Sequence, residues 1–345
     1  METKNDEVPL SQRRLKVGII FNSKKGVHAK AADAEAEYDN PETVAAITQA
    51  LSRAGYEVTA LEADGTLAQS VKSSGIDIAF NIAEGLRGRG REAEVPALLT
   101  MLDIPYTGSD ETALAVSLDK EMCKRLLSTY GVPVPASSVA DGLESLDQLN
   151  LTYPLIIKPN AEGSSKGVSD TCVVRNPQEL RAMLEQDLEL YGEPMLCEEY
   201  LPGREFTVGI LGNGKTARVF PPMEIEFRGN TQGDYKVYSY NVKQDYQKYV
   251  SYHCPADITP QQAQAMENAA LTAFAALGCR DFARVDFRMD AEGTPRFIEI
   301  NPLPGLAPGY SDYPMLAAFS GVEYETLVCS VLQSALRRLG MEAAK

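Results

Sequence analysis

The sequence predicts a mixed fold of the α/β and α+β classes, with a parallel α/β unit at the N-terminus. Strongly apolar runs at 15–21 and 77–82 alternate with stretches of helical spacing, which is typical of parallel strands covered by helices. Farther along, 284–301 reads as two alternating strands around a short turn, which indicates antiparallel pairing. The chain of 345 residues is also too long for one core, so we expect two or three domains.

The N-terminal unit is expected to contain a strand at 15–21, a helix at 41–54, and strands at 57–61 and 77–82. Ligands of parallel α/β units lie beyond the carboxyl ends of the strands. The ligand-binding loops are therefore expected at residues 22–31 and 84–92, which are rich in glycine and charged residues. For any single residue there, a solvated loop is the alternative interpretation.

A long helix is predicted over 112–130, with Gly131 as its stop signal. A second unit then follows, with a helix at 177–191 and strands at 154–158, 171–174, 195–199 and 205–211. The third unit is expected to contain a strand reaching Phe220, a polar, tyrosine-rich segment at 228–253, a helix at 259–277, the hairpin at 284–301, and a closing helix after Gly321.

The hairpin carries the strongest chemical signal. Its period of two places Arg284, Asp286 and Arg288 on one face of the first strand, and Glu299 and Asn301 on one face of the second. If the two faces coincide, two carboxylates and an amide converge as hard oxygen ligands, a set that suits Mg²⁺. An ordinary half-exposed hairpin is the alternative, although the Pro-Leu-Pro-Gly exit is more typical of a site.

Composition limits the function classes. Lys and Arg number 33 against 48 Asp and Glu, a formal charge of −15, so binding to nucleic acid or an anionic membrane is not expected. The polar start lacks a secretory signal, and no run is long enough for a membrane span. Six scattered cysteines without a CxxC pair predict reduced thiols in a cytoplasmic protein.

Two further segments favour nucleotide binding. The loop at 162–167, rich in Gly and Ser, allows backbone N–H groups to approach a phosphate, and Lys158 ends the strand before it. It is not a Walker A motif, and a flexible hairpin is the alternative. The strand at 195–199 ends in two acids, Glu198 and Glu199, and Glu205 follows one turn later, a spacing that suits an adenine edge and ribose hydroxyls. A surface acidic pair is the alternative.

Taken in order, these motifs resemble the ATP-grasp superfamily and, within it, the D-alanine–D-alanine ligase family. The resemblance covers nearly the whole chain. It rests on residues 105–109 (PYTGS), 118–120 (LDK) with Lys124, 157–159 (IKP), 162–165 (EGSS), Glu198, 205–208 (EFTV), 255–256 (PA), 284–286 (RVD), 299–301 (EIN) and 304–305 (PG).

The resemblance implies an ATP-grasp fold behind an N-terminal parallel α/β (pre-ATP-grasp) domain, divided at residues 1–110, 111–215 and 216–345. It implies ATP as a cofactor, with two Mg²⁺ ions and Mn²⁺ as an alternative. The nucleotide residues implied are Lys120, Lys158, Ser165, Glu198, Glu199, Tyr200, Leu201, Glu205 and Lys243, with Lys243 on a mobile loop within 228–253. The metal ligands implied are Asp286, Glu299 and Asn301, and the catalytic residues are Arg284, Gly305, Lys243 and Ser164.

The chain departs from the family pattern mainly where substrates bind. Residues 81–85 (NIAEG) replace the usual His-Gly pair, and Gln244 stands where tyrosine usually follows the loop lysine. Residues 301–307 (NPLPGLA) replace Asn-Thr-Ser-Pro-Gly-Met-Thr. Candidate substrate residues are Glu37, with Glu35 and Glu42 as alternatives, then Glu84, Gln244 and Ser311, and Arg87, Arg89 or Arg91 for a carboxylate.

These observations predict an ATP-dependent carboxylate–amine ligase that forms an acyl phosphate and releases ADP and phosphate. D-Alanine dimerisation is the nearest named activity. A second hypothesis keeps the mechanism and joins an amino acid to another acceptor, such as a second amino acid or a secondary-metabolite scaffold. A third is a non-catalytic nucleotide or amino-acid binding module. Small amino-acid-like substrates and a homodimer are expected.

Overall fold

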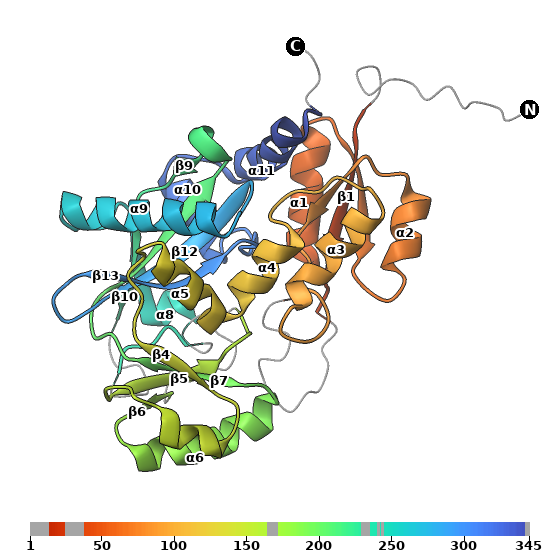
Figure 1. The fold of residues 1–345 in the computed structure, drawn as a ribbon. Helices are drawn as coiled ribbons and strands as arrows, with labels where there is room; N and C mark the ends of the chain where they lie inside the picture. The colour runs from red at the N-terminus through yellow and green to blue at the C-terminus, as the bar shows by residue number, and fades with distance from the viewer. Residues whose placement is uncertain are drawn as a thin grey trace, which may run out of the picture.

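The computed structural model describes residues 14–24, 38–163, 172–228, 235–239, 242 and 245–341. In this part of the chain the strands form three sheets, which lie in different regions of the molecule (Figure 1). The mixed α/β prediction is therefore confirmed, whereas the domain boundaries at 110/111 and 215/216 stay predictions.

The N-terminal sheet has the order β2-β1-β3, and both pairings are parallel. Its strands are β1 (Lys16–Phe21), β2 (Glu57–Glu62) and β3 (Ile78–Asn81). The helices of this unit are α1 (Pro41–Arg53), α2 (Leu67–Ser74) and α3 (Glu94–Met101), and α3 follows the 3₁₀ helix η2 (Arg91–Ala93). Because all three strands run in the same direction, the loops after β1 and β3 leave the sheet at one edge, as predicted.

The prediction of a single helix over 112–130 is wrong, because two helices occupy this segment: α4 (Glu111–Leu118) and α5 (Lys120–Thr129). Asp119 between them is extended, with φ −78° and ψ 95°, and its carboxylate accepts a hydrogen bond from Met122 N at 3.0 Å. A carboxylate in this position caps a new helix. Asn160 Nδ2 also donates to Asp119, at 2.8 Å, so the start of α5 is tied to the end of β5 (Leu155–Pro159).

The central sheet has the order β4-β7-β5-β6 and is antiparallel. Besides β5 it contains β4 (Ser137–Ala140), β6 (Val173–Val174) and β7 (Met195–Glu199), and one face packs on α6 (Pro177–Tyr191) and η3 (Leu143–Gln148). The strand β4 is absent from the predicted elements. Thr171, the predicted start of β6, lies outside the described residues.

The third sheet has the order β11-β10-β8-β12-β13, and β9 pairs with β8. Its strands are β8 (Glu205–Leu211), β9 (Arg218–Val219), β10 (Met223–Phe227), β11 (Val250–His253), β12 (Phe282–Met289) and β13 (Pro295–Asn301), with η4 (Gly214–Thr216) before β9 and α8 (Tyr246–Tyr249) before β11. The helix α9 (Pro260–Ala276) covers one face through Met266, Ala270 and Ala273. The strand β8 thus belongs to this sheet although it precedes residue 216.

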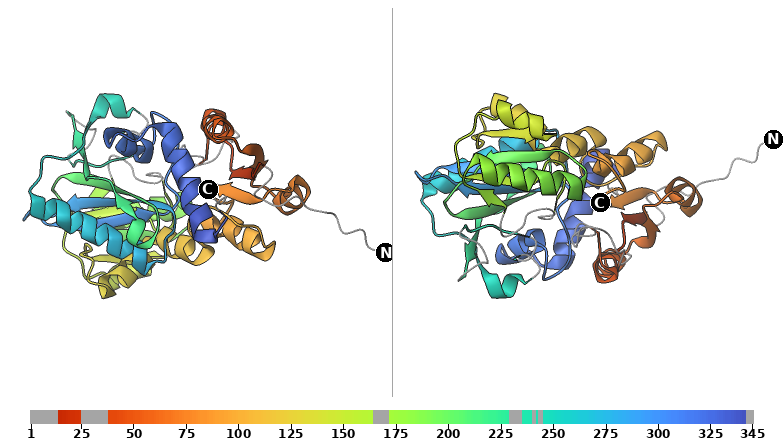
Figure 2. Two further views of the ribbon diagram at one scale, coloured as in Figure 1. Left: turned by 90° about the horizontal axis from the view of Figure 1, so that it is seen from above. Right: turned by 90° about the horizontal axis from the view of Figure 1, so that it is seen from below.

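The two C-terminal helices, α10 (Asp312–Phe319) and α11 (Tyr324–Leu339), join the N-terminal unit to the third sheet. One buried cluster contains Ile47 of α1, Phe80 of β3, and Val328 and Val331 of α11. Figure 2 shows the C-terminal helix between the N-terminal strands and the rest of the molecule. Because this core is shared, the first unit is fixed in position relative to the hairpin β12–β13.

All six cysteines are free thiols, and four of them are buried, as predicted. Within the described ranges, no single helix is long and apolar enough to cross a membrane; α10 and α11 pass such a test only together, and they are bent by 106° at the break between them.

Candidate active site

The hairpin β12–β13 places its polar residues face to face. Asp286 pairs with Glu299 and Arg284 with Asn301, so these four side chains share one face, as the alternation predicts. Arg284 donates two hydrogen bonds to Asp286, from Nε to Oδ1 at 3.0 Å and from Nη2 to Oδ2 at 2.8 Å. Asn301 Nδ2 lies 3.3 Å from Asp286 Oδ2. The face therefore combines two carboxylates and an amide with one arginine.

The two carboxylates differ in their electrostatic surroundings. Burial raises the pKa of Asp286, although Arg284 opposes this shift. Burial also acts to raise the pKa of Glu299, but the positive charges of Lys120, Lys158 and Arg284 together lower it to about 2. Glu299 is therefore ionised at neutral pH, and a hard divalent cation would find at least one full negative charge on this face.

The donor set fits a hard divalent cation, because two carboxylates and an amide oxygen lie on one buried face. Asp286 and Glu299 retain only 17% and 22% exposure of their side chains. No group of three or more His, Cys, Asp or Glu that could hold a metal occurs among the residues the structure describes, so the hairpin set depends on the amide of Asn301 as its third ligand.

Two lysines pair with one buried glutamate beside the hairpin, and a third pairs with Glu299. Lys158, at the end of β5, lies 3.1 Å from Glu198 Oε1, and Lys124 of α5 contacts Glu198 Oε2. Burial lowers the pKa of Lys158 to about 8, while Glu299 acts to raise it. Lys120, the first residue of α5, points to the other side and lies 3.8 Å from Glu299 Oε2. Positive charge is thus concentrated where the central sheet meets the hairpin.

Glu205 is held by a partner that was not predicted. Arg288, opposite Glu205 on the neighbouring strand, donates to Glu205 Oε2 at 3.1 Å and to Tyr200 Oη at 2.9 Å. The guanidinium of Arg288 also lies 4.8 Å from the centre of the Tyr200 ring. Burial raises the pKa of Glu205 to about 7, with Arg288 opposing the shift.

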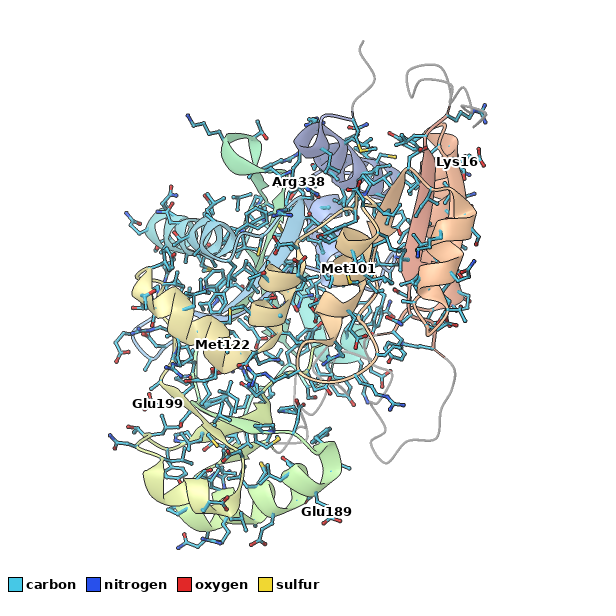
Figure 3. All side chains as sticks on the ribbon, turned by 45° about the vertical axis from the view of Figure 1, so that its right-hand side comes forward. Lys16, Met101, Met122, Glu189, Glu199 and Arg338 are labelled. Carbon is cyan, nitrogen blue, oxygen red and sulfur yellow. The ribbon has the colours of Figure 1, made fainter. Side chains whose placement is uncertain are left out.

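A cavity of about 100 Å³ lies between the central and third sheets. Its lining includes all of the described residues that were expected to bind nucleotide: Lys120, Lys158, Glu198, Glu199, Tyr200, Leu201 and Glu205. Arg284, Asp286 and Glu299 line its inner end. Figure 3 shows Glu199 at the level where the central sheet meets the rest of the molecule. We call this space the nucleotide-side cavity.

A second cavity of about 100 Å³ lies between the hairpin and the N-terminal unit, and we call it the substrate-side cavity. Glu84, Asn301, Gly305 and Ser311 line it. Lys120, Glu162, Arg284, Glu299 and Asp312 line both cavities, so the two spaces meet at these residues. A phosphoryl donor in one cavity and an acceptor in the other would therefore meet beside Lys120 and Arg284.

The predicted substrate residues are only partly brought together. Glu84 and Ser311 lie on the substrate-side cavity, whereas Glu42 is exposed on the first turn of α1 and lines none of the three cavities described. Arg87, Arg89 and Arg91 line a separate, third cavity. Ser164, Ser165, Lys243, Gln244, Glu35 and Glu37 lie outside the described residues.

Several residues of the site were not predicted. The sequence puts Arg288 on the correct face without indicating a role for it, and it indicates Glu162 only as the start of a loop. Asp312 is 2% exposed and lies 3.6 Å from Arg284, where it lines both cavities. Asp39 lines the substrate-side cavity, and burial raises its pKa to about 7 while Lys24 opposes the shift. In the sequence, Asp39 is marked as a candidate only by its position shortly after the predicted ligand loop that follows β1.

Comparison with known proteins agrees with this geometry. Residues 137–333 match the family described as D-ala D-ala ligase C-terminus. A D-alanine–D-alanine ligase from Bordetella avium is 31% identical, over 96% of this chain and 98% of the relative. The crystal structure of the Bacillus anthracis D-alanine–D-alanine ligase complexed with ATP gives a TM-score of 0.73 at 23% identity and covers 94% of this chain and 98% of that one.

The VanG D-Ala:D-Ser ligase from Enterococcus faecalis has a TM-score of 0.71 at 21% identity, covering 94% of this chain and 100% of that one. The structural likenesses establish the ATP-grasp fold, and the sequence relatives extend over nearly the whole chain. This protein therefore belongs to the D-alanine–D-alanine ligase family of ATP-grasp enzymes.

Proposed function

We propose that this enzyme is an ATP-dependent carboxylate–amine ligase that joins two small amino-acid-like substrates and releases ADP and phosphate. One observation carries the proposal. The nucleotide-side and substrate-side cavities share Lys120, Arg284 and Glu299, so a phosphoryl donor bound in one would lie next to an acceptor carboxylate bound in the other. The substrate carboxylate accepts the γ-phosphoryl group, and the second substrate's amine then attacks the acyl carbon of this acyl phosphate and displaces phosphate.

On the nucleotide side, Lys120 and Lys158 are assigned to the phosphates, because both ammonium groups border the nucleotide-side cavity at its junction with the hairpin. The segment 198–201 is assigned to the adenine and Glu205 to the ribose. The cavity of about 100 Å³ is smaller than the roughly 300–1,000 Å³ of ligand pockets in general, so the cavity has to widen before ATP enters. Ser165 and Lys243 are assigned to the phosphates by motif alone.

Asp286, Glu299 and Asn301 are assigned to Mg²⁺, and the number of ions and the alternative of Mn²⁺ stay predictions. When bound, the metal would offset the charge on the phosphate oxygens. Asp286 is already bound by Arg284 in this structure. A metal that binds Asp286 therefore competes with Arg284 for this carboxylate.

On the substrate side, Arg284 and the backbone N–H of Gly305 are assigned to the oxyanion that forms when the amine attacks. Arg284 already lies at the junction of the two cavities and Gly305 lines the substrate-side cavity. Glu84 and Ser311 are assigned to substrate, and Ser164, Glu37 and Gln244 keep their predicted roles at the same site. The free thiols are compatible with a cytoplasmic enzyme, and a homodimer stays a prediction.

Substrate identity needs a direct measurement. ADP release is measured with ATP and Mg²⁺ across single D- and L-amino acids and their pairs, and the products are identified by mass spectrometry. Turnover with D-alanine alone would show that the enzyme joins two D-alanine molecules, the activity after which the family is named. Turnover only with another amino acid or pair assigns a different acceptor.

The double variant Asp286→Asn, Glu299→Gln separates an enzyme from a binding module. We expect it to abolish turnover while calorimetry still detects nucleotide binding. Glu292→Gln, in the exposed turn of the same hairpin, is the matched control and should behave as wild type. Absence of ADP release from the wild type with every acceptor would support the binding module instead.

A further inference from the structure

A third cavity, with a volume of about 1160 Å³, is lined by residues of α5 that do not line the nucleotide-side cavity, among them Met122 and Arg125. Its walls come mainly from segments that are far apart in sequence: the loop 86–91 of the N-terminal unit, α5, residues 160–162 after β5, and residues 191–194 at the end of α6. Figure 3 shows Met122, one of its lining residues, on α5 at the middle of the molecule. At this volume the cavity can hold a ligand far larger than a single amino acid.

The acidic residues of this cavity are already bound within the protein. Asp119 accepts from Met122 N at 3.0 Å and lies 3.0 Å from Arg89. Glu121 accepts a hydrogen bond from Ser137 Oγ at 2.6 Å. Glu162 is paired with the buried Arg91 at 2.8 Å, and Glu193 is also engaged. The negative charges of Asp119 and Glu162 are therefore matched by arginines, whereas the hydrogen-bond donor to Glu121 is a neutral hydroxyl.

Two of its cations are not matched. Arg87 and Arg125 are exposed, and neither guanidinium group has a hydrogen bond or ion pair within the part of the chain that the structure describes. The cavity lining carries four arginines and four acidic residues, and Arg89 and Arg91 are paired with Asp119 and Glu162, so Arg87 and Arg125 are the guanidinium groups left to attract an anion. Arginine suits a carboxylate in particular, because its planar fork can donate two parallel hydrogen bonds.

Apolar side chains accompany these arginines. Leu86 is 47% exposed and Met122 is 44% exposed, and both line the cavity beside the arginines. Leucine and methionine make adaptable contacts with an aliphatic stem. The lining therefore combines contacts for an aliphatic stem with contacts for an anionic end.

The third cavity also adjoins the reaction centre. Tyr38 and Glu162 line both this cavity and the substrate-side cavity, and Glu162 lines the nucleotide-side cavity as well. The backbone carbonyl of Glu162 accepts a hydrogen bond from Lys120. A ligand that reaches from the junction past Glu162 would thus have its reactive end beside Lys120 and its far end near Arg87 and Arg125.

We propose that the third cavity binds the far end of an acceptor that is longer than a small amino acid, with Arg87 and Arg125 holding a distal carboxylate. This inference rests on the proposed ligase function, which supplies the amine attack at the near end. It identifies the acceptor class as an amine with a carboxylate on an extended stem, such as a dipeptide or an amino acid with a long acidic side chain.

The test compares acceptors that differ only in the distal group: 2-aminoadipate against its side-chain amide, and the dipeptide Ala-Glu against Ala-Gln, each in D and L forms. ADP release is measured with each, and mass spectrometry identifies the product. The double variant Arg87→Gln, Arg125→Gln is compared with the double variant Lys72→Gln, Lys215→Gln. The control removes the same charge from exposed residues that lie outside this cavity.

We expect the wild type to favour the distal carboxylate by about tenfold in kcat/KM, the magnitude of two partly exposed ion pairs. The arginine variant should lose this preference through a higher KM, with kcat and the KM for ATP unchanged, while the lysine variant keeps it. Equal use of acid and amide acceptors by the wild type would overturn the inference, as would an unchanged preference in the arginine variant.

A binding measurement separates failure of this inference from failure of the ligase function. If no acceptor gives ADP release, Ala-Glu and Ala-Gln are titrated by calorimetry into the intact protein in the presence of ADP and Mg²⁺. If the wild type binds Ala-Glu more tightly than Ala-Gln and the arginine variant does not, the carboxylate site is supported even though the ligase function has failed. Equal binding of the two dipeptides excludes the site.

Discussion

Arg284 binds both carboxylate oxygens of Asp286, two residues farther along β12, at 3.0 and 2.8 Å. The same guanidinium lies 3.6 Å from Asp312. Asp286 also faces Glu299 across the hairpin, and two carboxylates on one buried face repel each other unless a cation lies close by. Arg284 therefore offsets the charge of this face when no metal is bound, and a metal has to compete with it.

This competition gives a first prediction for Arg284→Gln. Turnover should fall by about 100-fold, because a group assigned to the developing oxyanion is lost. The Mg²⁺ concentration that half-saturates nucleotide binding should fall severalfold, because Asp286 is then free and the local negative charge is higher. Kinetics of ADP release and calorimetric titrations at several Mg²⁺ concentrations measure the two effects.

Arg296→Gln is the control for this experiment, since Arg296 pairs with Asp290 at 2.9 Å at the other end of the same hairpin. It should leave both quantities unchanged. A rise in the Mg²⁺ requirement of Arg284→Gln would show that Arg284 supports the metal site and does not compete with it.

A second prediction concerns Glu198, which lies between Lys124 and Lys158. Burial and the charges of Lys158 and Lys120 lower the pKa of Lys124 well below its usual value. Glu198→Gln leaves two buried lysines without their shared carboxylate, and loss of one partner from a buried ion pair costs about 3–5 kcal/mol. We expect the free energy of unfolding in urea to fall by about 3 kcal/mol.

The neighbouring variant Glu199→Gln is the comparison, because Glu199 is only partly buried and accepts one hydrogen bond from Thr152 N. The free energy of unfolding of this variant should fall by about 1 kcal/mol. Equal losses in the two variants would mean that the lysines move out to solvent when Glu198 is changed.

A third prediction follows from the pKa of Glu205, which burial raises to about 7 from 4.5. The native state binds this proton more tightly than the unfolded state does. The resulting stability is fully present below about pH 4.5 and is lost as the pH rises through about 7. Glu205→Gln removes this dependence, so its stability relative to wild type should increase between pH 5 and pH 8.

Urea unfolding at several pH values between 4.5 and 8.5 measures the effect, which is up to about 3 kcal/mol for a shift of this size. Glu185→Gln, on the exposed surface of α6, should follow the wild type at every pH. A constant difference between Glu205→Gln and wild type would show that Arg288 compensates the buried charge fully.

The sequence predicted the parts of the site that local geometry determines. Alternation along a strand fixes which side chains share a face, so Arg284 and Asp286 could be grouped from their spacing, whereas grouping them with Glu299 also required the register set by the turn. A strand end likewise located Lys158. These inferences need only the period of a strand and a short turn, both of which are local properties of the chain.

The remaining features depend on contacts between distant segments. Glu205 and Arg288 are paired because β8 lies next to β12, an order that alternation does not reveal. The break between α4 and α5 was missed because both helices have the same period, and Asp119 can cap a helix or lie within one. The third cavity was missed because loop 86–91 meets α5 only in the folded chain.

The last prediction concerns the close approach of Gly305 and Ser311. A Cβ atom at Gly305 would lie 2.8 Å from Ser311 Oγ, which also accepts a hydrogen bond from Ala307 N at 3.2 Å. Gly305→Ala should therefore displace Ser311 from the substrate-side cavity and raise the KM of the acceptor by about tenfold, whereas Gly65→Ala meets no atom within 4 Å and should have no effect. In the double variant Gly305→Ala, Ser311→Ala the displaced hydroxyl is absent, so the two losses in kcat/KM should not add. Fully additive losses would mean that Gly305 acts independently of Ser311, through its own backbone N–H.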